Sequence, residues 1–370
     1  MNILEERVDK KSEKYLQNKV INDKKLQRYI VDNIGLSYDE KIEFSKCKPY
    51  INRIIPDVKI VKQKEILALV ECKGAKINVT DYVRGIGQLY QYEKFAKENI
   101  LEKNSKEHYS KNFYTLYIYP SEVTKNNDFN IANFKYPDST KILQVNLENF
   151  ITREFNETQK DKFSNTGENL IAISEYYFRD NRIFELYIVI KYLKKNFSNR
   201  KESLNRQDLE SNHLKKFNTP NNNNWRNAFI SLSGLGFISK KNLLTEAGKD
   251  ISNYNYPQFC SLIYYSYIKP YVDELLPIIL DKPNISLNEV SEIIKTRNGD
   301  KDVLFLTESG NRYLSSWLGI FRDDFGFINY EPRNKNRTIN YDPKDMKESE
   351  LIDNIKKYTK GTRYLATDIT

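Results

Sequence analysis

The chain has 370 residues, of which 39% are hydrophobic and 13% aromatic, and its formal net charge is +9. This length predicts two or three domains, and the apolar content excludes a wholly disordered chain. No run approaches the roughly 18 apolar residues of a membrane span and the N-terminus lacks a signal peptide pattern, so we expect a cytoplasmic protein.

The cysteine and histidine content narrows the kind of site further. The three cysteines, Cys47, Cys72 and Cys260, are widely spaced, and the chain has only two histidines. This composition fits a reducing compartment and excludes a disulfide framework and a metal site rich in Cys or His. The positive charge favours a polyanion such as nucleic acid as partner. Exposed lysines spread along the chain would explain the charge equally well.

The first 160 residues have the pattern of an α/β domain. Apolar residues recur at helical spacing up to Gly35, which is a helix stop signal, and Thr80 or Asp81 can cap a second helix. Between these helices, two short runs rich in β-branched residues predict strands joined by a turn at 62–65. The predicted elements are helices at 10–34 and 80–98 and strands at 54–61, 66–73, 113–119 and 142–145.

The rest of the chain is mainly helical. Helices predicted at 168–197 and 225–232 precede a small hairpin around Lys240, an order typical of a winged helix. The order returns later in the chain, with predicted helices at 271–280, 287–295 and 314–321 and a hairpin formed by 325–330 and 338–341. We therefore predict an α/β domain over 1–160 with a mixed central sheet, followed by two mainly helical winged-helix domains over 161–255 and 256–370.

A group of charged residues interrupts the apolar strands of the first domain. Side chains alternate along a strand, so Glu71 and Lys73 share one face while Cys72 faces the opposite core. Asp57 begins the neighbouring strand and can place a second carboxylate beside Glu71. These carboxylates, with the backbone carbonyl of Cys72, are hard oxygen ligands of the kind that Mg²⁺ prefers. Lys73 can orient an attacking water or stabilise charge on a phosphate.

A purely structural ion pair is the alternative role for these charges. Glu71 and Lys73 follow five consecutive apolar residues, where a buried strand normally stays apolar. Burying charges there is costly unless they have partners or a function. The pattern therefore favours a catalytic group.

At these residues the chain resembles the PD-(D/E)xK nuclease superfamily, which includes many restriction endonucleases. The matching string is Pro56-Asp57, thirteen intervening residues, and then Glu71-Cys72-Lys73. The resemblance covers about residues 10–145. It implies a twisted mixed sheet flanked by helices, and cleavage of nucleic acid that depends on one or two Mg²⁺ ions per active site.

The resemblance also implies two companions of the central group. Family members often carry an acidic residue on an upstream helix, for which we predict Asp23, with Glu13 as the alternative. They also often have a Gln-containing helix after the Lys strand. Gln88 would then lie near the active site and Tyr92 would pack the helix.

The winged-helix interpretation predicts DNA contacts in the second half of the chain. A recognition helix reads base edges in the major groove, and the hairpin tip contacts phosphates. The alternative is an ordinary solvated surface, or a module that binds proteins. The predicted DNA-binding residues are polar or basic and lie at helix starts and hairpin tips: Asn222, Asn223, Asn224, Arg226, Asn227, Lys240, Lys241, Arg312, Ser315, Arg333, Lys335 and Arg337.

Together these patterns predict a type II restriction endonuclease that makes Mg²⁺-dependent, sequence-specific cuts in double-stranded DNA. Because one active site cuts one strand, we expect a homodimer at least during cleavage, and a cognate DNA methyltransferase encoded nearby. The alternatives are a methylation-dependent restriction nuclease, a nuclease subunit of a transposition system, and a non-catalytic winged-helix regulator. No Walker-type phosphate-binding motif is present in the sequence, which argues against ATP-driven translocation.

Overall fold

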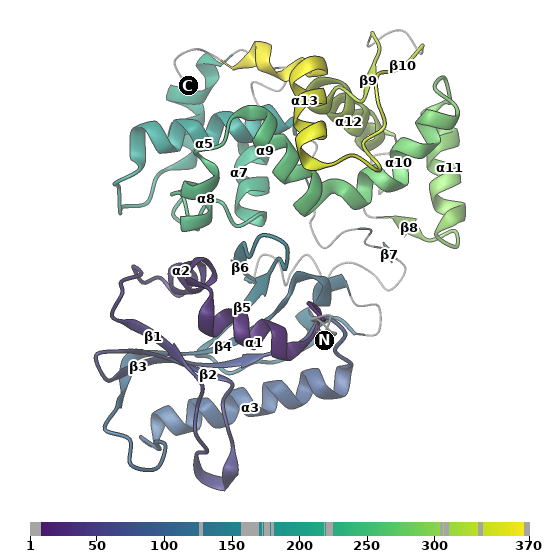
Figure 1. The fold of residues 1–370 in the computed structure, drawn as a ribbon. Helices are drawn as coiled ribbons and strands as arrows, with labels where there is room; N and C mark the ends of the chain where they lie inside the picture. The colour runs from purple at the N-terminus through teal and green to yellow at the C-terminus, as the bar shows by residue number, and fades with distance from the viewer. Residues whose placement is uncertain are drawn as a thin grey trace, which may run out of the picture. The chain divides into compact units, whose positions relative to one another are not determined.

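The structure is a computed structural model that describes residues 9–125, 129–156, 170–171, 173, 178, 181–217, 219, 225–303, 306, 311–331 and 336–365. The chain divides into two compact units, Met1–Thr166 and Gly167–Thr370, which we call unit 1 and unit 2 (Figure 1). Within the described residues, no helix has the length and apolar character needed to span a membrane.

Unit 1 is built on a six-stranded mixed sheet, which agrees with the predicted α/β class. Strands β3, β4 and β5 run parallel to one another, and each remaining neighbouring pair is antiparallel. In order across the sheet the strands are β1 (Ile42–Ser45), β2 (Val58–Lys62), β3 (Glu65–Cys72), β4 (His108–Pro120), β5 (Thr140–Val145) and β6 (Thr152–Glu154). The short strands β1 and β6 at the two edges were not predicted.

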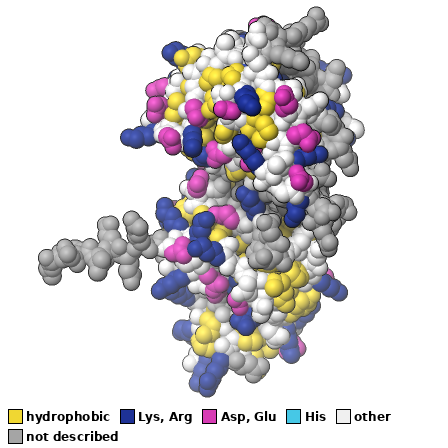
Figure 2. All heavy atoms as spheres, turned by 90° about the vertical axis from the view of Figure 1, so that its right-hand side faces the viewer, with side chains coloured by type: hydrophobic (Ala, Val, Ile, Leu, Met, Phe, Trp, Pro, Cys, Tyr) yellow, Lys and Arg dark blue, Asp and Glu magenta, His cyan; other side chains and the backbone are white. Residues whose placement is uncertain are grey.

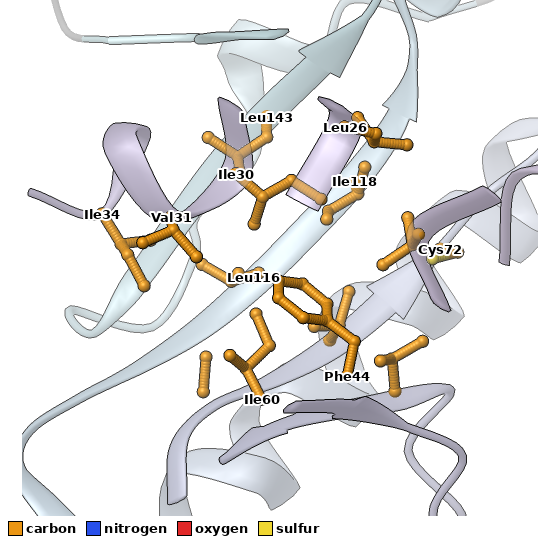
Figure 3. Packing of buried hydrophobic residues seen from close by; sticks show 14 of the residues in the cluster. Leu26, Ile30, Val31, Ile34, Phe44, Ile60, Cys72, Leu116, Ile118 and Leu143 are labelled. Atoms are coloured by element: carbon orange, nitrogen blue, oxygen red, sulfur yellow. The ribbon is translucent and has the colours of Figure 1, made fainter. Parts of the chain in front are cut away.

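Helices cover both faces of this sheet (Figure 1). Helices α1 (Glu13–Asn22) and α2 (Lys24–Asn33) pack on one face, where apolar side chains of α2 meet Leu116, Ile118 and Leu143 of the strands (Figure 3). The predicted single helix over 10–34 is thus two helices. Asp23 separates them, because its side chain accepts hydrogen bonds from the first backbone N–H groups of α2.

Helix α3 (Val79–Lys97) packs on the opposite face. Its buried side chains, which include Tyr82 and Tyr92, meet Tyr117 and Tyr119 of β4 in an aromatic core. The helix begins after Asn78, whose side chain accepts a hydrogen bond from the Asp81 N–H, so the cap lies just before the predicted Thr80 or Asp81.

Unit 2 is mainly helical. The chain order of α10, α11 and α12 followed by the antiparallel pair β9–β10 confirms the predicted order of three helices and a hairpin, while the winged-helix fold itself stays a prediction. A short antiparallel bridge between Ile238 and Leu244 forms the earlier predicted hairpin. The described α-helices and strands of unit 2 are α5 (Ile183–Phe197), α6 (Arg206–Asp208), α7 (Trp225–Gly234), α8 (Glu246–Ile251), α9 (Tyr256–Ile263), α10 (Lys269–Asp281), α11 (Leu287–Arg297), α12 (Arg312–Ile320), α13 (Glu348–Tyr358), β7 (Leu170–Ile171), β8 (Asp302–Val303), β9 (Ile328–Asn329) and β10 (Thr338–Ile339).

The core of unit 2 is continuous across the predicted domain boundary at 255/256. Tyr187 of α5 packs its ring against Tyr256 and Phe259 of α9. The buried Asp324 accepts hydrogen bonds from the Tyr256 hydroxyl and from the Phe184 N–H at the start of α5. Residues on both sides of the boundary therefore share one core within unit 2, and the division of this unit into two domains stays a prediction.

Candidate active site

The predicted charged group gathers at one end of the central strands. Glu71 and Lys73 lie at the carboxyl end of β3, and Cys72 packs into the opposite core, as the alternation of the strand predicted. Asp57 lies immediately before β2, where its N–H donates to the Val70 carbonyl at 3.1 Å. Its Oδ2 accepts a 2.7 Å hydrogen bond from the Cys72 N–H. The pairing of β2 with β3 therefore places Asp57 beside the end of β3.

Glu71 is almost fully buried, at 2% exposure, and both of its carboxylate oxygens accept a hydrogen bond. Lys73 Nζ lies 2.6 Å from Oε1, and the Tyr92 hydroxyl of α3 donates to Oε2 over 2.6 Å. Short hydrogen bonds to an ionised group are strong and directional. The orientation of Glu71 is therefore fixed from two sides, and Tyr92 does more than pack α3 against the sheet.

Glu13, rather than Asp23, is the upstream carboxylate that reaches this group. Glu13 begins α1, and its Oε2 lies 3.6 Å from Lys73 Nζ. Asp23 follows the other end of this ten-residue helix, about 15 Å away along its axis. There it caps α2 and lies 3.7 Å from Lys19. The structure thus places Glu13, the alternative acid, beside Lys73, whereas Asp23 ends α1 and caps α2.

A close approach of two chain segments places Glu13 at the site. A side chain at Gly74 would put its Cβ 2.9 Å from the Glu13 nitrogen and 3.0 Å from the Lys11 carbonyl oxygen. Ala75 N–H also donates to this Lys11 carbonyl at 3.0 Å. The segment after β3 is therefore packed, backbone against backbone, on the segment that leads into α1.

Helix α3 closes the site from the side. A Cβ at Gly85 would lie 2.7 Å from Lys73 Cε and would meet the Tyr117 hydroxyl, so glycine lets the helix approach Lys73. Gln88 lies half-buried between Gly85 and Tyr92, and helical spacing puts the three residues on one face. Gln88 is therefore on the helix face that meets the site, although it is Tyr92 of this helix that donates a hydrogen bond to Glu71.

Three carboxylates surround one ammonium, so the group carries excess negative charge. Burial raises the pKa of Asp57 to about 6, and the charge of Glu13 adds to the rise. Burial raises the pKa of Glu71 to about 7, and the charge of Asp57 adds to it. Burial alone would lower the pKa of Lys73, but the carboxylates outweigh it and the pKa is raised. Lys73 therefore stays charged at neutral pH, while the pKa values of Asp57 and Glu71 lie near neutrality.

This donor set fits Mg²⁺ in its chemistry. Within the described residues, no three or more His, Cys, Asp or Glu side chains are arranged to hold a metal ion. Mg²⁺, however, is commonly held by one or two carboxylates with waters, and Asp57 and Glu71 supply two. The Cys72 carbonyl points to the same strand edge as its N–H, which is bonded to Asp57. A divalent cation would also offset the excess negative charge.

The site adjoins a cleft of about 420 Å³ between the start of α1 and the start of α3. Its lining includes Glu13, Lys73 and Gly74 from the site, together with Lys11, Lys76 and Arg84. No basic residue of this cleft other than Lys73 was predicted as functional. The close packing of α3 against Lys73 did have a signal in the sequence. Gly85 lies inside the predicted helix, and a glycine in a helix interior often marks a close approach.

The predicted DNA-binding residues of unit 2 that the structure describes differ in how exposed they are to solvent. Arg226, Lys240, Lys241, Arg312 and Ser315 are exposed, and Asn227 is half-buried. On α12, Arg312 and Ser315 lie one turn apart on the exposed face. Lys240 and Lys241 lie in the turn between Ile238 and Leu244.

Arg337 is instead engaged within unit 2. Its guanidinium donates to the carbonyl oxygens of Pro283 and Ile285 at 2.7 and 2.9 Å, which ties the hairpin to the connection between α10 and α11. The remaining candidates, Asn222, Asn223, Asn224, Arg333 and Lys335, lie outside the described residues. On the face that Figure 2 shows, Lys and Arg side chains lie among Asp and Glu side chains in each unit.

Comparison of the chain with known protein families, curated proteins and solved structures gives no match.

Proposed function

We propose that this protein is a Mg²⁺-dependent endonuclease that hydrolyses phosphodiester bonds in double-stranded DNA at specific sequences, as type II restriction endonucleases do. The observation that carries the proposal is the group of half-buried Asp57 and buried Glu71 and Lys73 on adjoining strand ends, with more negative than positive charge, beside an open cleft. A structural ion pair needs one acid for each base, and beyond Glu71 this lysine has two further acids near it, Asp57 and Glu13.

The side chains have distinct parts in such a reaction. Bound Mg²⁺ supplies Lewis acidity and makes a bound water more acidic. Asp57 and Glu71, with the Cys72 carbonyl, are the residues that would hold it. Lys73 stays protonated, so its ammonium can stabilise the charge that develops on a phosphate oxygen. Tyr92 orients the Glu71 carboxylate through its hydrogen bond. Gly85 leaves the space beside α3 that the Lys73 side chain occupies.

In this proposal unit 2 selects the DNA sequence. Its exposed Arg226, Arg312 and Ser315 lie on helices, and Lys240 and Lys241 lie in a turn, which are the positions from which winged helices contact bases and phosphates. A homodimer would bring two active sites to the two strands. A methyltransferase of the same specificity would protect the host DNA.

Four single substitutions test the proposed active site. Asp57→Ala and Lys73→Ala should abolish cleavage of plasmid DNA in Mg²⁺ but keep DNA binding, because the proposed sequence contacts lie in unit 2. The ion pair of Asp39 and Lys62, 2.6 Å apart on the surface of unit 1, offers matched controls. Asp39→Ala and Lys62→Ala should cleave like the unchanged protein. Unchanged cleavage by both active-site variants would reject the proposal.

A further inference from the structure

The cleft beside the active site has walls that are fixed by backbone contacts. One wall is the segment before α1, which includes Lys11, and the other is the segment after β3, which includes Lys76. The hydrogen bond from Ala75 N–H to the Lys11 carbonyl joins the two walls, and Gly74 lets them approach. Lys73, which lies in the active site, also lines the cleft. Lys11 and Lys76 therefore stand at set positions beside the reacting group.

Only some of the basic side chains that line this cleft form ion pairs with described carboxylates. Arg84 pairs with Asp81 at 2.9 Å, and Lys73 pairs with Glu71. Lys11 and Lys76 are both exposed, and no described carboxylate forms an ion pair with either ammonium. Two ammonium groups that have no ion pair among the described residues, beside a cluster of acids, contribute little to the stability of the fold, since they lie on the surface. Their placement suits an anionic ligand that passes over the site.

We infer that this cleft holds the sugar-phosphate backbone of the strand being cut, and that Lys11 and Lys76 bind the phosphates next to the scissile one. The inference rests on the proposed nuclease function and extends it, because the DNA-binding residues predicted from the sequence outside the active site all lie in unit 2. A volume of about 420 Å³ is that of a small-ligand pocket, so the cleft admits a short stretch of one strand rather than a duplex.

Lysine contacts to phosphates have a measurable signature. Each contact releases counterions, so the logarithm of the binding constant falls with the logarithm of the salt concentration by about 0.9 for each phosphate neutralised on duplex DNA. The Lys11→Ala/Lys76→Ala variant should therefore show a slope that is smaller by about 2, and weaker binding to every sequence. Lys11→Arg/Lys76→Arg should keep the slope, because arginine also neutralises phosphates.

The matched control is a second pair of lysines in unit 1. Lys106 and Lys111 are exposed and lie near His108, which pairs with Glu65 at the opposite end of β3 from the site, about 20 Å away. Lys106→Ala/Lys111→Ala makes the same change in net charge. The slope of this variant should equal that of the unchanged protein.

The experiment measures binding of a fluorescein-labelled, random-sequence DNA duplex by anisotropy, in EDTA and over a series of salt concentrations. A reduced slope for Lys11→Ala/Lys76→Ala alone supports the inference. An unchanged slope, or an equal reduction in the control pair, overturns it. Cleavage of plasmid DNA by the unchanged protein is tested in parallel. If the unchanged protein cleaves and the slope of Lys11→Ala/Lys76→Ala is not reduced, the inference is wrong but the nuclease function stands. A reduced slope without any cleavage by the unchanged protein rejects the nuclease function.

Discussion

The burial of two active-site carboxyls, together with the negative charge around them, makes the stability of unit 1 depend on pH in one direction. Folding raises the pKa of Asp57 from 3.8 to about 6 and that of Glu71 from 4.5 to about 7. A carboxyl whose pKa is raised by folding stabilises the folded state fully below its unfolded pKa, and this contribution is lost as the pH rises through the folded pKa. Without metal, unit 1 should therefore lose stability as the pH rises from about 4 to about 7.

The size of this loss follows from the two pKa values. A change of one in a pKa corresponds to about 1.4 kcal/mol, so each carboxyl taken alone accounts for about 3 kcal/mol. Because the charge of Asp57 raises the pKa of Glu71, the two contributions overlap, and we expect about 3 to 6 kcal/mol for the pair. Asp57→Asn cannot ionise and relieves Glu71, so it should remove at least half of the loss. Mg²⁺ should restore more stability at about pH 8 than at about pH 5, since it binds the ionised carboxylates.

Hydrogen exchange of peptides from β3 and α3, in EDTA and corrected for the intrinsic effect of pH, measures this loss. Both tryptophans, Trp225 and Trp317, lie in unit 2, so their fluorescence would not report on it. Asp39→Asn is the control, because a hydrogen bond from Lys62 lowers the pKa of Asp39 and its contribution is constant above about pH 5. The reasoning is refuted if the unchanged protein and Asp57→Asn lose equal stability.

Three further predictions concern the residues that position the site, and urea denaturation and plasmid cleavage rates check each of them. Tyr92→Phe should cost about 1.5 to 3 kcal/mol and slow cleavage, because a hydrogen bond to a buried carboxylate is lost. Gly85→Ala should cost about 1 to 3 kcal/mol and slow cleavage, whereas Gly87→Ala, with open space around the added carbon, should be neutral or stabilising. Asp23→Ala should cost about 1 kcal/mol as a lost cap and keep cleavage, while Glu13→Gln should slow cleavage. Equal cleavage by the members of either pair would contradict these assignments.

Regular patterns made the central elements of unit 1 predictable. The strands β2, β3, β4 and β5 carry runs of β-branched or aromatic residues, and α3 has an apolar stripe. The edge strands β1 and β6 were missed because they are three or four residues long and partly polar. The break at Asp23 was missed because the apolar residues of α1 and α2 continue at helical spacing across it.

In the site, contacts between residues close in the sequence were predictable, and contacts between distant segments were not. Glu71 and Lys73 are two residues apart on a strand, so their common face follows from strand geometry alone. The choice between Glu13 and Asp23 depends on the backbone contact at Gly74, which joins segments far apart in the sequence. The hydrogen bond between Tyr92 and Glu71 likewise depends on how α3 packs on the sheet. Spacing along the chain holds no information on either contact.

Digestion of plasmid DNA by the purified full-length protein is the most direct test of the proposed function. Unmodified and methylated plasmids are incubated with the protein in Mg²⁺ or in EDTA, and the fragment ends are sequenced. We predict discrete double-strand cuts that depend on Mg²⁺ and share a common sequence at their ends. The absence of discrete fragments from both plasmids in Mg²⁺ would contradict the central claim.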